Sequence, residues 1–386
     1  MRRILSISVL VAAILGSMVL WRDSKLAVAD FTAFWIAGHQ LVRMHNPYDR
    51  SYALRVERSM GFTESRPLMM RNPPWALWVV IPLGVLGARA ARLVWTVCLV
   101  IILWVSAVQL WLIYDGSARW RWVAVLLAFS FGPTLACLAV GQTAPLVLLG
   151  FTLFLCLNQR HEFSAGCALL PAAFKPQVAF LFWLALVLWS VQYRKWRLMA
   201  GLILSLTVAT GIAALFDSQV MNHYGLMLRE ESIETQFIPT LAGALRQVFG
   251  RSWLELLPAT LGIALCLLYY LGRRHDWNWR DRLPILLLAS MLLTPYAWLA
   301  DELVLLAALI AASAAISTLR RSLELAIPFF GANLAIIALL LAGVRVNSPA
   351  YLWTVWAWAS LYFAAQAGRS RGQGQSRTRK LALRLR

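Results

Sequence analysis

Residues 165–191 have the sequence AGCALLPAAFKPQVAFLFWLALVLWSV, in which Lys175 is the only charged residue. About 20 apolar residues suffice to cross the hydrocarbon core of a bilayer, and shorter segments are tolerated inside a helix bundle. Pro176 divides the run directly after the lysine, so we predict two membrane segments, 163–175 and 177–192. A charged side chain between such segments is costly unless it is paired, which makes Lys175 a candidate functional residue.

Composition extends this conclusion to the whole chain. Of the 386 residues, 60% are hydrophobic and 14% are charged, whereas soluble domains have about 45–50% apolar and about 25% charged residues. A bilayer is therefore the natural solvent for this chain. The net charge of +19 would indicate nucleic-acid binding in a soluble protein. Here Lys and Arg lie in short loops and in the C-terminal tail, as the positive-inside rule expects, so we predict no nucleic-acid partner.

Apolar runs recur along the sequence and predict an all-α polytopic membrane protein with about 11–13 transmembrane helices. We assign residues 1–366 to a single transmembrane domain and residues 367–386 to a basic cytoplasmic tail. The polar stretches at about 21–72 and 217–252 are the two long loops. The apolar runs lie at roughly 4–20, 73–87, 92–114, 120–140, 143–158, 163–175, 177–192, 197–216, 253–271, 283–298, 300–318, 323–343 and 351–366.

The distribution of basic residues orients the chain. The N-terminal arginine pair and the C-terminal tail belong in the cytoplasm under the positive-inside rule, which places the two long loops outside. The run 120–140 conflicts with this topology, because it makes the number of crossings between the outer connections odd. Gly132-Pro133 divides that run, and a re-entrant pair of short helices there would restore the parity. An incorrect division of residues 73–114 is the alternative.

Asp30 opens the motif Asp30-Phe31-Thr32-Ala33-Phe34-Trp35 in the first outer loop, shortly after the first predicted helix. A carboxylate beside aromatic residues at a membrane interface has a low-dielectric setting, which suits a general base. The alternative is an ordinary N-cap of a following amphipathic helix. Position alone leaves both interpretations open.

Three basic side chains on the predicted outer face are candidates for binding a phosphate. Lys175 lies at the outer boundary of its apolar run, and an anion is the obvious partner for a desolvated ammonium. Arg71 precedes the helix start at Asn72-Pro73-Pro74-Trp75, and Arg246 lies where the second long loop returns to the membrane. Snorkelling toward the headgroups is the alternative for Lys175 and Arg71.

Further polar residues interrupt the apolar runs on the same face. Gln142 lies between two apolar runs, where an amide is costly unless it is hydrogen-bonded, either to a ligand or to another helix. Asp301 and Glu302 follow a second interruption. They pair with Lys175 or Arg246, contact a ligand, or lie in the headgroup region.

The sequence predicts neither a metal site nor a cofactor. His39 and His45 in the first outer loop lack a third ligand at suitable spacing. The five cysteines lie inside apolar runs without a CxxC pair, which indicates neither a disulfide framework nor a zinc site.

Six short blocks in a fixed order resemble the DUF2029-type membrane glycosyltransferases, glycosyltransferase family 87, which use the GT-C fold. The blocks are Asp30-Phe31 with Phe34-Trp35, Ala37-Gly38 and Asn46-Pro47-Tyr48-Asp49; Pro73-Pro74 with Pro82-Leu83; Gly141-Gln142; Phe174-Lys175-Pro176-Gln177 with the basic residues of 194–197; Pro239-Thr240 through Arg246; and Pro295-Tyr296 with Asp301. Each block alone is weak, and their common order makes the resemblance specific. Ala300 and Thr240 depart from the pattern, which bears on the donor sugar and the acceptor rather than on the class.

The resemblance implies a GT-C architecture with a long first extracytoplasmic loop and an active site on the outer face of the bacterial plasma (inner) membrane. It implies a polyprenyl-phosphate-linked sugar donor, often carrying mannose, and a lipid or glycan acceptor. Asp30 would be the general base of an inverting hexosyl transfer, with Lys175, Arg246 and Arg71 at the donor phosphate and no metal. The side chains expected at the sugar or the acceptor are Gln142, Gln177, Asn46, Tyr48, Tyr296, Asp301 and Glu302.

Other classes remain open on the residues alone. A lipid-linked polysaccharide ligase or polymerase would have a long outer loop with Arg and His late in the chain and would not need Asp30. A transporter or flippase would have inverted repeats and charges at the bilayer midplane, and no repeat is visible. An inactive scaffold of the same fold would tolerate substitution of Asp30.

Overall fold

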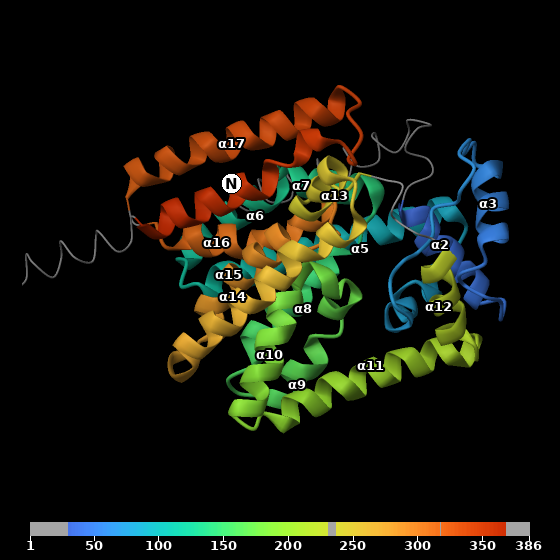
Figure 1. Ribbon diagram of the computed structural model, residues 1–386, viewed down its shortest axis with the longest axis horizontal. Coiled ribbons are helices and arrows are strands. Elements are labelled where there is room, and N and C mark those ends of the chain that lie inside the picture. Colours follow the sequence, from blue (N-terminus) through green and yellow to red (C-terminus); the bar gives the residue numbers. More distant parts are fainter. Residues whose placement is uncertain (1–29, 231–236, 317, 368–386) are drawn as a thin grey trace, which may run out of the picture.

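The computed structural model describes residues 30–230, 237–316 and 318–367 (Figure 1). Within these ranges the chain forms helices joined by turns and contains no strand, which confirms the predicted all-α fold. In Figure 1, α17 runs along one edge of the bundle and α11 along the opposite edge. The described segments that are long and apolar enough to cross a membrane unaided are α5 (Ala88–Ile113), α11 (Trp196–Phe216), Ser252–Asp276 around α14 (Leu257–Arg273), and Arg320–Leu341 within α17 (Leu319–Leu341).

Two further segments reach this length only as bent pairs. The helical segments Ala118–Ser130 and Gly132–Val140 meet at 60°, and Glu162–Phe174 and Pro176–Gln192 meet at 119°. Each pair bends beside a proline of the sequence, as the predicted division of both runs requires. The expected total of about 11–13 crossings stays a prediction, because the other apolar runs form helices shorter than a full span.

The shorter helices fill the bundle and its ends. One group packs against the long spans and contributes residues to the buried core: α6 (Arg121–Ser130), α7 (Gly132–Val140), α8 (Ala144–Leu157), α9 (Glu162–Ala168), α10 (Phe180–Gln192), α15 (Trp279–Leu293) and α16 (Leu306–Ala314). A second group belongs to the predicted outer loops and their junctions: α2 (Asp30–Leu41), α3 (Arg50–Ser59), α4 (Ile81–Gly84), α12 (Val220–Glu230) and α13 (Leu241–Phe249). Helices α2, α3 and α12 lie together at one end of the molecule (Figure 1).

Helix α2 is fixed by close backbone packing. All of its residues except Asp30 and His39 are buried, so α2 is not the amphipathic surface helix considered as the alternative for Asp30. The Trp35 indole donates to the Leu86 carbonyl at 2.9 Å. A Cβ on Gly38 would lie 2.2 Å from the Val80 carbonyl oxygen, so only glycine permits this approach. Several residues of the first motif therefore have a structural role, which is to set the position of Asp30.

The break between α6 and α7 receives its missing hydrogen bond from another helix. Gly132 begins α7 after the break, and its N–H donates to the Asn333 Oδ1 atom at 2.5 Å. Asn333 lies in α17 and is 2% exposed, and its amide nitrogen donates to the Phe329 carbonyl at 2.8 Å. Because apolar surroundings offer no water, a free backbone N–H there costs several kcal/mol. A polar residue inside a membrane helix thus stabilises the interruption of its neighbour.

Replacing Asn333 by Ala should lower the free energy of unfolding by about 1–3 kcal/mol, because the Gly132 N–H loses its acceptor. Asn158→Ala is the matched control, since the Asn158 amide donates only to the Phe154 and Leu155 carbonyls of its own helix. Thermal unfolding of both variants in the same detergent measures the difference. Equal losses for the two variants would contradict this role of Asn333.

Candidate active site

Four polar side chains meet where helices are interrupted. Asp30 is the first residue of α2, and Gln142 follows the C-terminal end of α7. Lys175 lies between the 3-10 turns η4 (Ala172–Phe174) and η5 (Pro176–Ala179), and Asp301 lies in the 3-10 turn η9 (Leu299–Leu305). Interrupted helices inside membrane proteins typically line a cavity or a binding site.

Gln142 holds the carboxylate of Asp30. Its Nε2 atom donates to Asp30 Oδ2 at 2.5 Å, and its Oε1 atom accepts from the Thr143 N–H at 3.2 Å. The second bond fixes the amide so that its NH₂ group faces Asp30. The residue Asp30 is only partly exposed, and α2 is not among the candidate membrane spans. The orientation of the Asp30 carboxylate is therefore set by the Gln142 amide.

Burial raises the pKa of Asp30 above its ordinary value of 3.8. The charge of Lys175, the Gln142 hydrogen bond and the charge of Arg92 oppose this shift, while Asp301 adds to it. A raised pKa makes the ionised carboxylate a stronger base than an exposed aspartate. These interactions also place Lys175, Asp301 and Arg92 in the surroundings of Asp30.

Lys175 and Asp301 form a buried ion pair. Lys175 Nζ lies 2.5 Å from Asp301 Oδ1, and the two side chains are 9% and 1% exposed. The other carboxylate oxygen of Asp301 accepts from the Trp298 N–H at 3.0 Å. Of the two cations considered for Asp301, the structure pairs it with Lys175 and not with Arg246. Each charge of this pair offsets part of the desolvation cost of the other.

The loop that carries Arg71 is bound to the segment before Lys175. Asn72 Nδ2 donates to the Phe174 carbonyl at 3.1 Å, and Trp75 Nε1 donates to the Ala173 carbonyl at 2.8 Å. Both donors come from the Asn72-Pro73-Pro74-Trp75 motif, so this motif does more than start a helix. Its contacts hold the segment after Arg71 against the backbone just before Lys175.

Tyr296 lies within electrostatic reach of Arg71 and Lys175, and Gln177 follows Lys175 by two residues. The charge of Arg71 acts on the Tyr296 phenol, as do those of Lys175 and Asp301. The hydroxyl of Thr294 donates to the Gln177 carbonyl at 3.1 Å, which joins the two predicted binding segments.

Two predicted site residues have partners outside this cluster. Arg246 Nη1 donates to Glu255 Oε2 at 3.0 Å, which joins α13 to the 3-10 turn that precedes α14. The Glu302 carboxylate, which is 4% exposed, accepts from the Thr354 hydroxyl at 2.5 Å and from the Trp358 indole at 2.8 Å. Adjacency in sequence placed Glu302 with Asp301, but their side chains bond to different partners.

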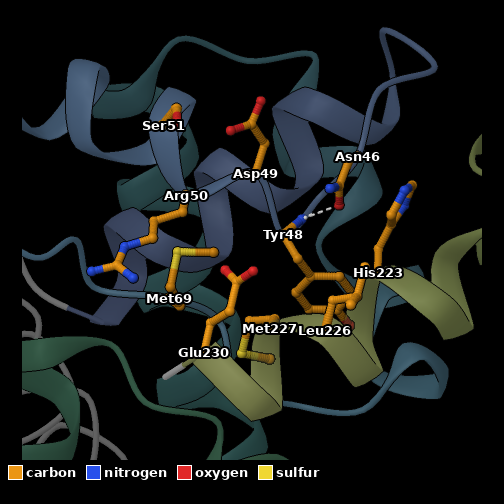
Figure 2. Close-up of a pocket in the computed structure, with 10 residues that line it drawn as sticks. All are labelled: Asn46, Tyr48, Asp49, Arg50, Ser51, Met69, His223, Leu226, Met227 and Glu230. Atoms are coloured by element: carbon orange, nitrogen blue, oxygen red, sulfur yellow. Dashed lines mark hydrogen bonds between the residues drawn. The ribbon is translucent and has the colours of Figure 1, made fainter. Parts of the chain in front are cut away.

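Asn46 and Tyr48 lie at a separate pocket between α3 and α12, with a volume of about 230 Å³ (Figure 2). Asn46 Oδ1 accepts from the Tyr48 N–H at 2.8 Å, and the Tyr48 hydroxyl donates to the Asn72 carbonyl at 3.1 Å. Figure 2 shows the Glu230 carboxylate directed toward the middle of the pocket from α12. The pocket therefore shares the Tyr48–Asn72 contact with the loop that carries Arg71.

Sequence reasoning did not single out Arg92, which the structure places beside Asp30. Arg92 is 4% exposed, although it lies near the start of an apolar run, where interfacial arginines are common. The feature of the sequence that could have identified Arg92 is its position as a charged residue at the start of an apolar run. Among the described residues, no group of three His, Cys, Asp or Glu side chains is arranged to hold a metal ion.

A comparison with protein families matches residues 71–342, more than half of the chain, to the model of glycosyltransferase family 87. The chain belongs to glycosyltransferase family 87. The matched range contains Gln142, Lys175 and Asp301, whereas Asp30 precedes it. No curated protein and no solved structure matches the chain in the corresponding comparisons. The family confirms a membrane glycosyltransferase.

Replacing Gly141 by Ala should abolish most of the glycosyl transfer. Gly141 has φ +75°, and a Cβ there would lie 2.4 Å from Arg92 Nη1 and 2.8 Å from Phe31 Cβ. Gly343→Ala is the matched control, because Gly343 also has φ +75° but has nothing within 4 Å of a Cβ. The control should lose about 1–2 kcal/mol of stability from the backbone alone, with transfer retained. Initial rates in membranes with equal protein levels test the contrast, and equal rates would remove the Gly141 turn from the site.

Substitutions in the Lys175–Asp301 pair should separate stability from activity. Lys175→Met leaves Asp301 buried without its cation and should cost about 3–5 kcal/mol of stability. The double variant Lys175→Met/Asp301→Asn is neutral and should recover most of that loss without recovering transfer. Thermal unfolding in detergent and transfer rates measure the two effects. A double variant no more stable than the single one would contradict the ion-pair interpretation.

Proposed function

We propose that the protein transfers a hexosyl group from a polyprenyl-phosphate donor to a hydroxyl of a lipid or glycan acceptor, with inversion, on the outer face of the bacterial plasma membrane. The main observation in support of this proposal is the Gln142–Asp30 hydrogen bond, which lies near the buried Lys175–Asp301 ion pair. A base for a hydroxyl and a cation for a leaving phosphate are the groups that this reaction needs.

In the proposed step, the acceptor oxygen attacks the anomeric carbon from the face opposite the phosphate. The bond between that carbon and the phosphate oxygen breaks, and its electrons leave with the lipid phosphate. Asp30 takes the proton of the acceptor hydroxyl, while Gln142 keeps the carboxylate oriented toward it. Negative charge thus moves from Asp30 to the phosphate, where Lys175 and Arg71 stabilise it.

The charge balance around Asp30 supports this assignment. With both carboxylates ionised, Asp30 and Asp301 balance Lys175 and Arg92. When Asp30 accepts the acceptor proton, the same four groups carry one positive charge. An environment that becomes cationic as the phosphate becomes more anionic favours the products of the transfer.

The acceptor side is assigned to two regions. Gln177, Tyr296 and Asp301 adjoin the reacting groups and suit the sugar or the attacking hydroxyl. The pocket of Figure 2, with Asn46 and Tyr48, lies toward the other end of α2, a helix of 12 residues, or about 18 Å. It suits a part of the acceptor remote from the reaction, whose binding energy helps to orient the hydroxyl.

Arg246 and Glu302 could contact a substrate only after each had released its present partner. Arg246 would first have to exchange Glu255 for a phosphate, and Glu302 would have to release Thr354 or Trp358. We assign the leaving phosphate to Lys175 and Arg71 because the charges of both act on the Tyr296 phenol, together with that of Asp301.

The test is transfer of radiolabelled sugar from polyprenyl-phosphate donors to endogenous lipids, in membranes with equal levels of wild type or Asp30→Asn. Asparagine keeps the shape but cannot accept the proton, so transfer should fall by about 10²–10⁴-fold. In the wild type, activity should fall as the pH drops through the raised pKa of Asp30, because the base is then protonated. An ordinary aspartate would retain activity to lower pH.

Asp115→Asn is the matched control, since Asp115 is 80% exposed and pairs with Arg280 at the surface. It should transfer sugar at the wild-type rate. Transfer that survives Asp30→Asn would retain the enzyme class and remove Asp30 as its base. No transfer from any donor by properly inserted wild type would favour the ligase, polymerase or transporter alternatives.

A further inference from the structure

Arg92 is a buried cation whose contacts are to backbone carbonyls and an aromatic ring. Its Nη2 atom donates to the Leu138 carbonyl at 3.1 Å and to the Ala139 carbonyl at 2.5 Å. Its guanidinium carbon lies 5.1 Å from the centre of the Phe31 ring. The Nη1 atom is buried and has no hydrogen-bond partner. Among the described residues, no carboxylate lies within ion-pair distance of Arg92.

The two carbonyls belong to the last turn of α7, directly before Gly141. A cation at the C-terminal end of a helix stabilises carbonyls that have no partner within the helix. Arg92 Nη1 occupies the space that a side chain at position 141 would need. Arg92 and Gly141 are therefore complementary in shape as well as in charge.

Trp95, three residues after Arg92 in α5, also contacts the C-terminal turn of α7. Its Nε1 atom donates to the Gly141 carbonyl at 2.7 Å. Residues three apart lie on one face of a helix, so Arg92 and Trp95 together form a seat for residues 138–141. The N–H groups of Gly141 and Gln142 both donate to the Cys137 carbonyl, at 2.8 and 3.0 Å, which completes the turn.

We propose that Arg92 is a positioning residue of the active site, which holds the C-terminal turn of α7 and thereby keeps Gln142 in hydrogen-bond contact with Asp30. The assignment of a base role to Asp30 rests on the proposed function above, whereas the positioning itself rests on the contacts of Arg92. A neutral side chain could fill the same space at lower cost, because a desolvated guanidinium without an ion-pair partner is expensive. The choice of arginine is explained by the two carbonyls and by the carboxylate nearby.

Protonation of Asp30 reports this positioning without any need for turnover. The groups that act on Asp30 are Lys175, Asp301, Arg92 and the amide of Gln142. The Gln142 hydrogen bond favours the ionised carboxylate, so displacing Gln142 raises the pKa of Asp30. Arg92→Lys keeps the charge but cannot reproduce the planar contact with both carbonyls.

The experiment is a double-mutant cycle on the full-length protein with Arg92→Lys, Gln142→Met and both together. N,N′-dicyclohexylcarbodiimide, which modifies protonated carboxyl groups in apolar surroundings, is applied over a pH series. Mass spectrometry measures the labelled fraction of Asp30, with Asp30→Asn as the blank. Transfer rates of the same samples give kcat. Arg89→Lys is the matched control, because Arg89 is exposed in the first turn of α5.

We expect Arg92→Lys to move the labelling midpoint of Asp30 to higher pH by up to about one unit and to lower kcat by up to about 10²-fold. Both effects should nearly vanish in the Gln142→Met background, because Arg92 acts through Gln142. Arg89→Lys should match the wild type. If Arg92→Lys does not insert, Trp95→Phe loosens the same turn and takes its place in the cycle.

Additive effects of Arg92→Lys and Gln142→Met would overturn the inference, as would an unchanged midpoint in Arg92→Lys. A rise in KM for the donor with unchanged labelling would instead make Arg92 a donor contact and contradict the positioning role. Because the labelling needs no sugar transfer, an inactive wild type would refute the proposed function and still leave the positioning role decided by the midpoints.

Discussion

The ion pair between Lys175 and Asp301 is the constraint on which the site depends. Neither charge is tolerable alone in apolar surroundings, and each comes from a place where a helix is interrupted. Their attraction joins the break between η4 and η5 to the start of η9. Asp30 and Gln142 then meet beside a pair of charges whose positions are already fixed. Asp30 and Gln142 keep partial exposure, whereas Lys175 and Asp301 are buried.

Interrupted helices usually weaken a membrane protein, and this fold compensates each break from a neighbouring helix. Asn333 of α17 accepts the hydrogen bond of Gly132, and the Ser290 hydroxyl of α15 accepts that of Leu181 at 3.1 Å, in the first turn of α10. Both acceptors are short polar side chains within the apolar stretches of their helices, 283–293 in α15 and 325–341 in α17. The arrangement lets the chain place irregular backbone, and therefore chemistry, within the bundle.

Sequence patterns predicted the features that depend on residues close together in the chain. The apolar runs gave the all-α class, Gly132-Pro133 gave the break in the run 120–140, and the lone charge in residues 165–191 identified Lys175. Three-dimensional pairing was harder to predict. Asp301 and Glu302 are adjacent yet face different partners, because successive residues of a helical turn point in different directions. Arg92 resembled an interfacial arginine until α5 and α7 were seen to pack together. The role of Arg246 and the count of membrane crossings stay predictions.

The packing of α2 couples the tilt of that helix to the position of Asp30. Gly38 is in direct backbone contact with Val80, and Asp30 lies eight residues away along the helix, a distance of about 12 Å. A tilt of about 5° at the glycine contact would displace the carboxylate by about 1 Å, which is enough to cost an enzyme about two orders of magnitude in rate. The position of the Asp30 carboxylate is therefore set partly by the packing angle of α2 at Gly38, about 12 Å away along the helix.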